Sequence, residues 1–136
     1  MPDVFNPEER SRIMAKVRGE NTSPERLVRS LIHKMGYRFR LNVKDLPGKP
    51  DIVLKKHKKV IFVHGCFWHQ HEGCPHAARP SSNTEYWNKK LDRNMLRDRE
   101  NMHKLEYLDW NVLIVWKCET RDREKLIDKL KGFLTS

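Results

Sequence analysis

No stretch of this sequence approaches the ~20 consecutive apolar residues that a membrane-spanning helix requires, so we expect no membrane association. The segment from Met1 to Arg10 is polar and acidic, and it lacks the apolar centre of a secretory signal. Internal repeats, low-complexity tracts and interdomain linkers are also absent. These absences predict a single domain over residues 1–136 that acts inside the cell.

Acidic residues are scarce relative to basic ones. The chain has 18 Asp and Glu against 28 Lys and Arg, which gives a formal net charge of +10. Such a chain attracts polyanions, and nucleic acid phosphate is the commonest polyanion in cells. The composition therefore favours a nucleic-acid-binding protein over the alternative, a basic domain without a polyanionic partner.

Hydrophobic periodicity and turn signals predict an α/β domain. Asn6-Pro7-Glu8-Glu9 begins a short basic helix that ends near Val17. The later elements are a helix at 23–35, strands at 37–43, 51–54 and 60–63, a loop at 65–82, a helix at 82–108 that begins with a Ser82/Glu85 capping box, a strand at 111–116 and a helix at 121–134. Short turns make the first three strands antiparallel, and the helical crossover makes the last strand parallel to a neighbour.

The cysteines are three in number, which is a poor basis for a disulfide framework. Together with a nearby histidine they form a set of zinc-type ligands: Cys66, His71, Cys74 and Cys118. Three thiolates and one imidazole suit tetrahedral Zn²⁺, and four protein ligands indicate a structural site that orders the 65–82 loop. His69 or His76 could replace His71, and three buried apolar cysteines are the alternative to a metal site.

Pro50-Asp51 opens a predicted strand whose pairing would place Asp51 beside Val63 and His64. A carboxylate and a backbone carbonyl are hard oxygen ligands that suit Mg²⁺. The nuclease pattern of Pro-Asp followed by acidic-x-Lys is only half present, because Phe62-Val63-His64 supplies neither an acid nor a lysine. Taken alone, Pro-Asp is also typical of a turn before a strand.

Phe67 and Trp68 follow each other among histidines in the loop. In a basic protein, aromatic side chains on a metal-fixed loop suit stacking against bases or wedging between them, and histidine can act as a general base or acid. The alternative is that both rings cover the core. Trp87 has the same two interpretations, and helical periodicity favours the core for it.

Several ordered blocks of the sequence resemble the very-short-patch repair endonucleases. The blocks are Arg10-Ser11-x-x-Met14, Asn21-Thr22-Ser23-Pro24-Glu25, Leu46-Pro47-Gly48-Lys49-Pro50-Asp51, His64-Gly65-Cys66-Phe67-Trp68-His69, Thr84-Glu85-Tyr86-Trp87 and Val112-Leu113-Ile114-Val115-Trp116-x-Cys118. The resemblance implies a restriction-endonuclease-like αβββαβ core with an N-terminal helix and a structural zinc loop. It also implies a Mg²⁺-dependent nick 5′ to the T of a T:G mispair, the product of 5-methylcytosine deamination.

The resemblance further implies roles for individual residues. Asp51 and the backbone carbonyl of Val63 would hold Mg²⁺, His69 would be the base, His64 would assist at the phosphate, and Glu25 would orient metal-bound water. Structural zinc would be held by Cys66, His71, Cys74 and Cys118. Phe67, Trp68 and Trp87 would wedge in from the major groove and Met14 from the minor groove, with Lys90 near the DNA.

The expected partner is double-stranded DNA with T:G mismatches, bound by a monomer in the bacterial cytoplasm at the nucleoid, with the mismatch-repair machinery as a further partner. Two departures from the family pattern stand out: Val63 replaces a common Thr, and Glu72-Gly73 lengthens the zinc loop by one residue. Val63 and the missing acidic-x-Lys motivate a rival hypothesis, a non-catalytic zinc-stabilised DNA-binding module. A third hypothesis is a sequence-specific restriction enzyme, which usually needs a dimer.

Overall fold

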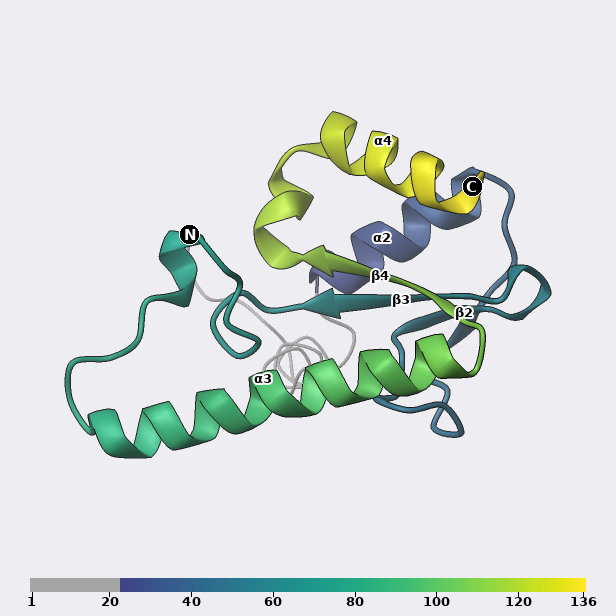
Figure 1. Ribbon diagram of the computed structural model, residues 1–136. Helices are drawn as coiled ribbons and strands as arrows, with labels where there is room; N and C mark the ends of the chain where they lie inside the picture. The colour runs from purple at the N-terminus through teal and green to yellow at the C-terminus, as the bar shows by residue number, and fades with distance from the viewer. Residues whose placement is uncertain (1–22) are drawn as a thin grey trace, which may run out of the picture.

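The computed structural model describes residues 23–136 (Figure 1); the expected helix that ends near Val17, and Met14 within it, lie outside the described residues. The helices and strands follow the mixed α/β order that the sequence predicts. In chain order they are α2 (Ser23–Lys34), β1 (Arg40–Leu41), β2 (Ile52–Leu54), η1 (Lys55–His57), β3 (Lys59–His64), η2 (Pro75–Ala77), α3 (Thr84–Tyr107), β4 (Asn111–Trp116), η3 (Lys117–Arg121) and α4 (Arg123–Leu134). Within residues 23–136, no helix is both long enough and apolar enough to cross a bilayer.

The strands form one four-stranded sheet in the order β1-β2-β3-β4. The first two pairings are antiparallel, and β3 pairs with β4 in parallel, with Val63 opposite Val115. Helix α3 makes the crossover from β3 to β4, as the sequence predicts. The carboxyl ends of β3 and β4 therefore lie at the same edge of the sheet.

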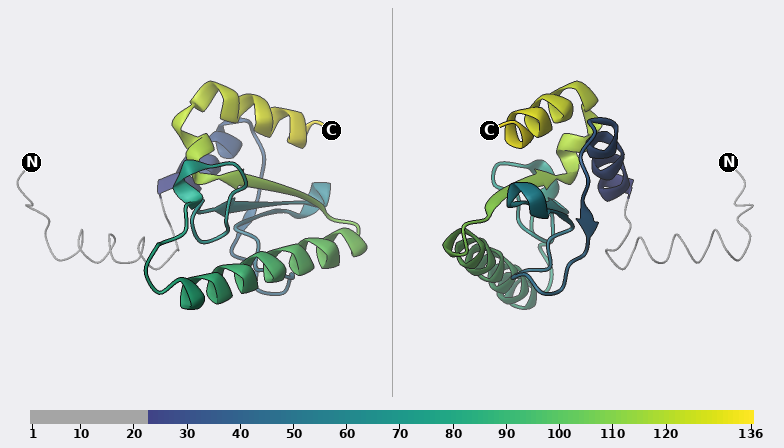
Figure 2. Two further views of the ribbon diagram at one scale, coloured as in Figure 1. Left: turned by 60° about the vertical axis from the view of Figure 1, so that its left-hand side comes forward. Right: turned by 90° about the vertical axis from the view of Figure 1, so that its right-hand side faces the viewer.

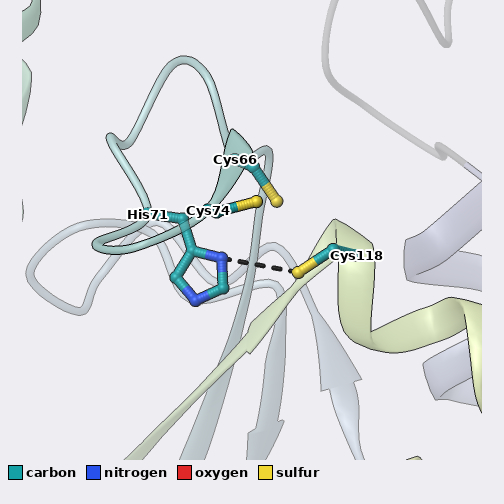
Figure 3. A group of neighbouring side chains, drawn as sticks. All are labelled: Cys66, His71, Cys74 and Cys118. Carbon is teal, nitrogen blue, oxygen red and sulfur yellow. Dashed lines mark hydrogen bonds between the residues drawn. The ribbon is translucent and has the colours of Figure 1, made fainter. Parts of the chain in front are cut away.

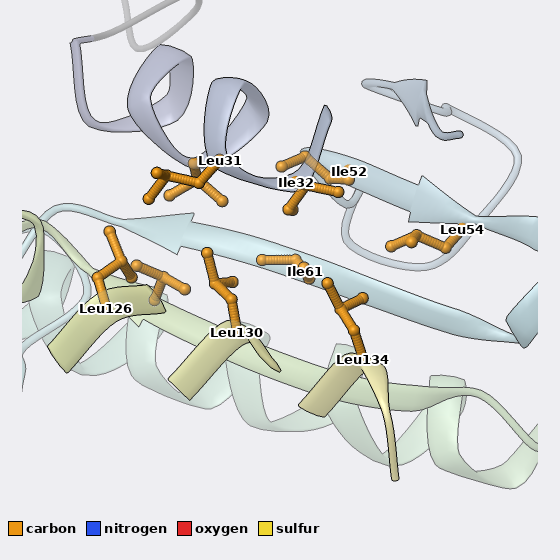
Figure 4. Close-up of a cluster of buried hydrophobic side chains, with 10 residues drawn as sticks. Leu31, Ile32, Ile52, Leu54, Ile61, Leu126, Leu130 and Leu134 are labelled. Carbon is orange, nitrogen blue, oxygen red and sulfur yellow. The ribbon is translucent and has the colours of Figure 1, made fainter. Parts of the chain in front are cut away.

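The sheet is the middle of three layers, with α2 and α4 on one face and α3 on the other (Figures 1 and 2). Ile52 and Leu54 point toward α2 and α4, whereas Val53 between them packs on the opposite side with Leu105 of α3. This alternation explains why the strand sequences are continuously apolar, since both faces are buried. Figure 4 shows the larger cluster, in which side chains of α2 and α4 meet those of β2 and β3.

Two local expectations are wrong. The strand expected at 37–43 is reduced to Arg40–Leu41, because Tyr37 and Phe39 pack against the α2/α4 core and Asn42 takes a left-handed φ of 48° that ends the ladder.

The capping box expected at Ser82 and Glu85 does not form either. Helix α3 begins at Thr84, after Asn83 with a φ of 51° and no side-chain cap. Because Asn83 turns the chain into the helix, Ser82 lies too early to cap it.

Helix α4 begins at Arg123, two residues later than expected. Its first turn is capped, because the Asp122 side chain accepts a hydrogen bond of 3.2 Å from the Lys125 amide.

Candidate functional site

A cavity lies where the start of β2 meets the carboxyl end of β3, and α2 and α3 also contribute to its wall. Its lining residues are Glu25, Gly48, Lys49, Asp51, Phe62, Val63, His64, His69, Asp98, Asn101, Met102 and Ile114. The cavity therefore collects ionisable side chains from parts of the chain that are far apart in sequence. Among them are the four residues to which the resemblance assigns catalytic roles.

Asp51 reaches the cavity because the antiparallel register of β2 and β3 brings the start of one strand to the end of the other. Its Oδ2 accepts a hydrogen bond of 2.6 Å from the backbone N–H of Val63, so Asp51 lies beside Val63 as the strand pairing predicts. Burial raises the pKa of Asp51 to about 6, and the Val63 N–H and the charge of His69 offset only part of that effect. A buried carboxylate of this kind is stabilised as an anion by a bound cation.

Three further side chains meet in the cavity: His64, His69 and Asp98. The rings of His64 and His69 stack with centroids 3.8 Å apart and an interplanar angle of 8°. The Nδ1 of His69 lies 2.6 Å from Oδ2 of Asp98 in α3. Burial, and next the charge of His69, lower the pKa of His64 to about 3, which keeps its ring neutral. Its Nδ1 is buried without a hydrogen-bond partner in the part of the chain that the structure describes.

Asp98 is a site residue that the sequence reasoning missed. It lies in a helix with many charged residues, where an acid is usually a solvent-exposed side chain. The available signal was its spacing, because Asp98 lies one heptad after Leu91 and one before Leu105, the two buried leucines of α3. An acid in the middle of a buried stripe needs a partner, and here the partner is His69.

Glu25 and Lys49 complete the ionisable lining. Glu25 is only 3 % exposed in the first turn of α2, and Arg29 donates a hydrogen bond of 3.2 Å to its carboxylate one helical turn later. The structure places Glu25 in the same cavity as Asp51, as its expected role requires. Lys49 was not singled out in the sequence, although it lies two residues before Asp51.

The predicted zinc ligands converge beside this cavity (Figure 3). One ligand atom from each of four residues lies within 4.8 Å of all the others: Cys66, His71, Cys74 and Cys118. His71, and neither His69 nor His76, completes the group, with its Nδ1 3.4 Å from the sulfur of Cys118. All three cysteines are free thiols. Burial and the neighbouring cysteines raise the pKa of Cys118 to about 11, so a metal ion would have to displace protons from these thiols.

The arrangement fits Zn²⁺, because three thiols and one imidazole are the soft and borderline donors that zinc prefers, and four ligands suit its tetrahedral coordination. The amide of His71 donates to the carbonyl of Cys66 at 2.9 Å, which curls the loop around the cluster. The ring of His71 also stacks on Trp116 at the end of β4, with centroids 4.2 Å apart. The cluster thus ties the 65–82 loop to the edge of the sheet, next to the cavity.

Aromatic rings gather where the loop meets the N-terminal part of α3. Phe67 contacts both Trp68 and Trp87, with ring centroids 5.2 and 5.6 Å apart. Trp68 is 48 % exposed, and neither it nor Phe67 belongs to the hydrophobic core. The core position favoured for Trp87 is wrong, because α3 extends past the sheet at this end and Trp87 packs on the loop aromatics instead (Figure 1). Lys90 lies with its Nζ 5.6 Å from the ring centroid of Trp68.

Residues 2–75 match a family model described as DNA mismatch endonuclease Vsr. A type II nicking enzyme, V.XorIIP of Xanthomonas oryzae, is 47 % identical over 98 % of this chain and 98 % of its own length. The DNA mismatch endonuclease Vsr of Escherichia coli is 42 % identical over 95 % of this chain and 82 % of its own length. A third relative, the type II nicking enzyme V.NmeAIP of Neisseria meningitidis, is 43 % identical over 90 % of this chain and 87 % of its own length.

Proposed function

This chain belongs to the Vsr family of DNA mismatch endonucleases, and from that premise we propose that it nicks one strand of duplex DNA 5′ to the T of a T:G mispair, in a Mg²⁺-dependent reaction. As a member of that family it is an endonuclease that acts on DNA. Its net charge of +10 supports binding to the phosphate backbone. One chain supplies the whole cavity, so we expect a single-domain monomer to be sufficient for one nick.

Asp51 and the backbone carbonyl of Val63 are the proposed Mg²⁺ ligands. The fit rests on the chemistry of the donors, which are hard oxygens, and on the raised pKa of Asp51, whose buried carboxylate gains from a neighbouring cation. When bound there, the ion would neutralise charge on the phosphate and lower the pKa of a coordinated water. Glu25, which lines the same cavity, would accept a hydrogen bond from such a water and orient it.

His69 is the proposed general base, and Asp98 is the residue that positions it. With Nδ1 held by Asp98 at 2.6 Å, the other ring nitrogen is left to accept a proton from the attacking water. The carboxylate then stabilises the imidazolium that forms. His64 is neutral and stacked on His69, so it restrains that ring and can donate one hydrogen bond to a phosphate oxygen without competing for the proton.

The zinc cluster and the aromatic rings would prepare the DNA. Zinc held by the four ligands would fix the loop that carries Phe67, Trp68 and His69, so the wedge and the base would be positioned by the same element. Exposed aromatic rings can enter a base step where stacking is already weakened, as at a mismatch. Lys90, beside Trp68 and Tyr86, suits a contact with the DNA next to the wedge.

The observation that carries the proposal is the meeting of Asp51, His64, His69 and Asp98 in one cavity next to an exposed aromatic cluster. A non-catalytic binding module has no need of a histidine oriented by a carboxylate inside a cavity. That pairing favours the nuclease over the binding module, even though the acidic-x-Lys half of the motif is missing.

The experiment that tests the proposal compares a T:G duplex with an otherwise identical T:A duplex, each labelled at one 5′ end. We expect a single nick 5′ to the mismatched T with Mg²⁺, none on the T:A duplex, and none when Mg²⁺ is left out of the buffer. Equal nicking of both duplexes, or nicking without Mg²⁺, would overturn the proposed specificity or the proposed metal dependence.

A further inference from the structure

Lys49 is the only lysine or arginine among the described residues that line the active-site cavity. The other ionisable groups there are carboxyl groups and imidazoles: Glu25, Asp51, Asp98, His64 and His69. A phosphodiester brings a negative charge into this cavity, and the transition state of its hydrolysis carries more. A cavity lined by three carboxyl groups therefore needs cationic groups that face the phosphate.

The backbone at Lys49 is strained. Its φ of 49° lies in the left-handed region, which costs a residue with a Cβ roughly 1 kcal/mol that glycine would not incur. Strain of this kind persists where the surroundings impose it, and it is concentrated at functional sites. Lys58 adopts the same conformation away from the cavity, so the φ angle alone indicates no function; at Lys49 it coincides with a place in the cavity lining.

The surroundings that impose the strain can be identified. Gly48, with a φ of 77°, packs so closely on α3 that a Cβ at its position would lie 3.1 Å from the Cβ of Asn101. The amide of Lys49 donates to the carbonyl of Leu46 at 3.1 Å, and Pro50 is fully buried on the other side. The turn is thereby fixed between α3 and β2, and it presents Lys49 and Asp51 to the same cavity.

We propose that the ammonium group of Lys49 contacts a non-bridging oxygen of the scissile phosphate and stabilises the charge that develops there. The acidic-x-Lys segment that would follow Pro50-Asp51 is absent, so its lysine is missing. Lys49, which precedes this pair, would supply that positive charge instead. The lysine keeps its proton throughout, since its part is electrostatic. This inference rests on the proposed nicking function and deepens it by adding a substrate-binding catalytic residue.

The first experiment separates catalysis from folding by using the strain itself. Lys49→Gly removes the side chain and relieves the left-handed φ, so the melting temperature should stay the same or rise, whereas single-turnover nicking of a T:G duplex should fall by about a hundredfold. Lys49→Arg should keep most of the activity and Lys49→Met should lose it. A merely structural lysine would give the opposite result, with Lys49→Met unstable and Lys49→Gly active.

Lys58 provides a matched control. It has the same left-handed conformation, with a φ of 55°, but lies between η1 and β3 and does not line the cavity. Lys58→Gly should leave the nicking rate per folded molecule unchanged. Equal losses in Lys58→Gly and Lys49→Gly would mean that any lysine lost from this surface weakens DNA binding, and the inference would be wrong.

The second experiment identifies the contact. A sulfur atom replaces one or the other non-bridging oxygen of the scissile phosphate, giving two diastereomeric T:G substrates. In the diastereomer whose sulfur replaces the oxygen that Lys49 contacts, the wild type has already lost the contact, so Lys49→Met should lower the nicking rate little further. In the other diastereomer, Lys49→Met should still lower the rate by about a hundredfold.

Equal penalties on both thio substrates would overturn the contact. If the wild type does not nick the T:G duplex at all, the proposed function itself fails. If it does, and Lys49→Met stays within about twofold of the wild type, only this inference fails.

Discussion

The ring of His69 lies flat on the ring of His64, with centroids 3.8 Å apart and planes inclined by 8°. Two imidazolium ions would repel each other strongly at this distance, so only one of the two rings can readily carry charge. Asp98 determines which, because its carboxylate lies 2.6 Å from Nδ1 of His69, whereas His64 is buried and has a pKa of about 3. In this pair His69 is the ring that faces a carboxylate, so it is the one on which a positive charge formed during catalysis would be stabilised.

The pairing predicts that Asp98→Asn lowers the rate of the chemical step by about a hundredfold or more while changing DNA affinity little. The amide cannot stabilise the imidazolium and allows the wrong tautomer of His69. Single-turnover nicking and binding titrations on the T:G duplex measure the two effects. Asp92→Asn is the control, since Asp92 lies on the same helix but pairs with Arg79 outside the cavity. Similar losses in both variants would contradict the assigned role.

Asp51→Ala should abolish nicking and leave DNA binding intact or slightly tighter. Without this carboxylate the proposed Mg²⁺ site has no charged protein ligand in the strand pairing, and a loss of roughly a thousandfold or more is expected. Binding should survive because removing an anion relieves repulsion with phosphate. His69→Ala should also be severely impaired but should still bind Mg²⁺. If Asp51→Ala kept about a tenth of wild-type nicking, the proposed active site would be wrong.

Asp51 also predicts a pH dependence of stability in the Mg²⁺-free protein. Its pKa is raised from 3.8 to about 6 in the folded state, so the folded chain binds a proton more tightly than the unfolded chain does. The stability that this proton confers is fully present below about pH 4 and is lost as the pH rises through 6. Asp51→Asn should therefore unfold at higher temperature than the wild type at pH 8, and by a smaller margin at pH 4. Calorimetry in buffer without Mg²⁺ but with the zinc retained measures both margins. An equal margin at the two pH values would contradict the assignment.

Removal of zinc should disorder the loop and with it the active site. We expect about one zinc ion per chain by elemental analysis, and a chelator that strips it should expose the region around Cys66 to proteolysis and abolish nicking. Cys118→Ser should weaken metal retention in the same way. Because binding displaces protons from thiols, retention should fall as the pH is lowered. A native disulfide between Cys66 and Cys74, or no bound metal, would contradict this prediction.

Trp68→Ala should reduce the preference for a T:G over a T:A duplex more than it reduces overall DNA affinity. An inserted ring gains most where base stacking is already poor, and Trp68 is exposed enough to reach a base step. Competition binding with the two duplexes measures the preference. As a comparison, Tyr107→Ala removes a ring that is 88 % exposed at the other end of α3 and should change neither quantity. Equal losses on both duplexes would mean that Trp68 only packs against Trp87.

The sequence by itself determined the local and near-local features. Apolar periodicity placed α2, and continuous β-branched runs placed β3 and β4, because such runs are stable only when both faces of a sheet are covered. The ligand types and their spacing predicted the Cys/His cluster, and the structure identified His71 as its histidine. The order of the strands placed Asp51 beside Val63, since an antiparallel turn brings those two ends together whatever the rest of the fold does.

Only the tertiary structure decided which residues distant in sequence join Asp51 and the histidines in the cavity. Asp98 lies on a helix that crosses the sheet, and its contact with His69 depends on how α3 packs against the strands, a matter of long-range geometry that no short motif encodes. Lys49 lines the cavity from a turn whose Gly48 packs closely on Asn101 of α3. Trp87 follows the periodicity of a core residue but belongs to neither core cluster, and its ring packs on Phe67 and Trp68 of the 65–82 loop. The spacing of residues along the chain sets which face of a helix or strand a side chain lies on, whereas the packing of helices against the sheet sets which other residues that face contacts.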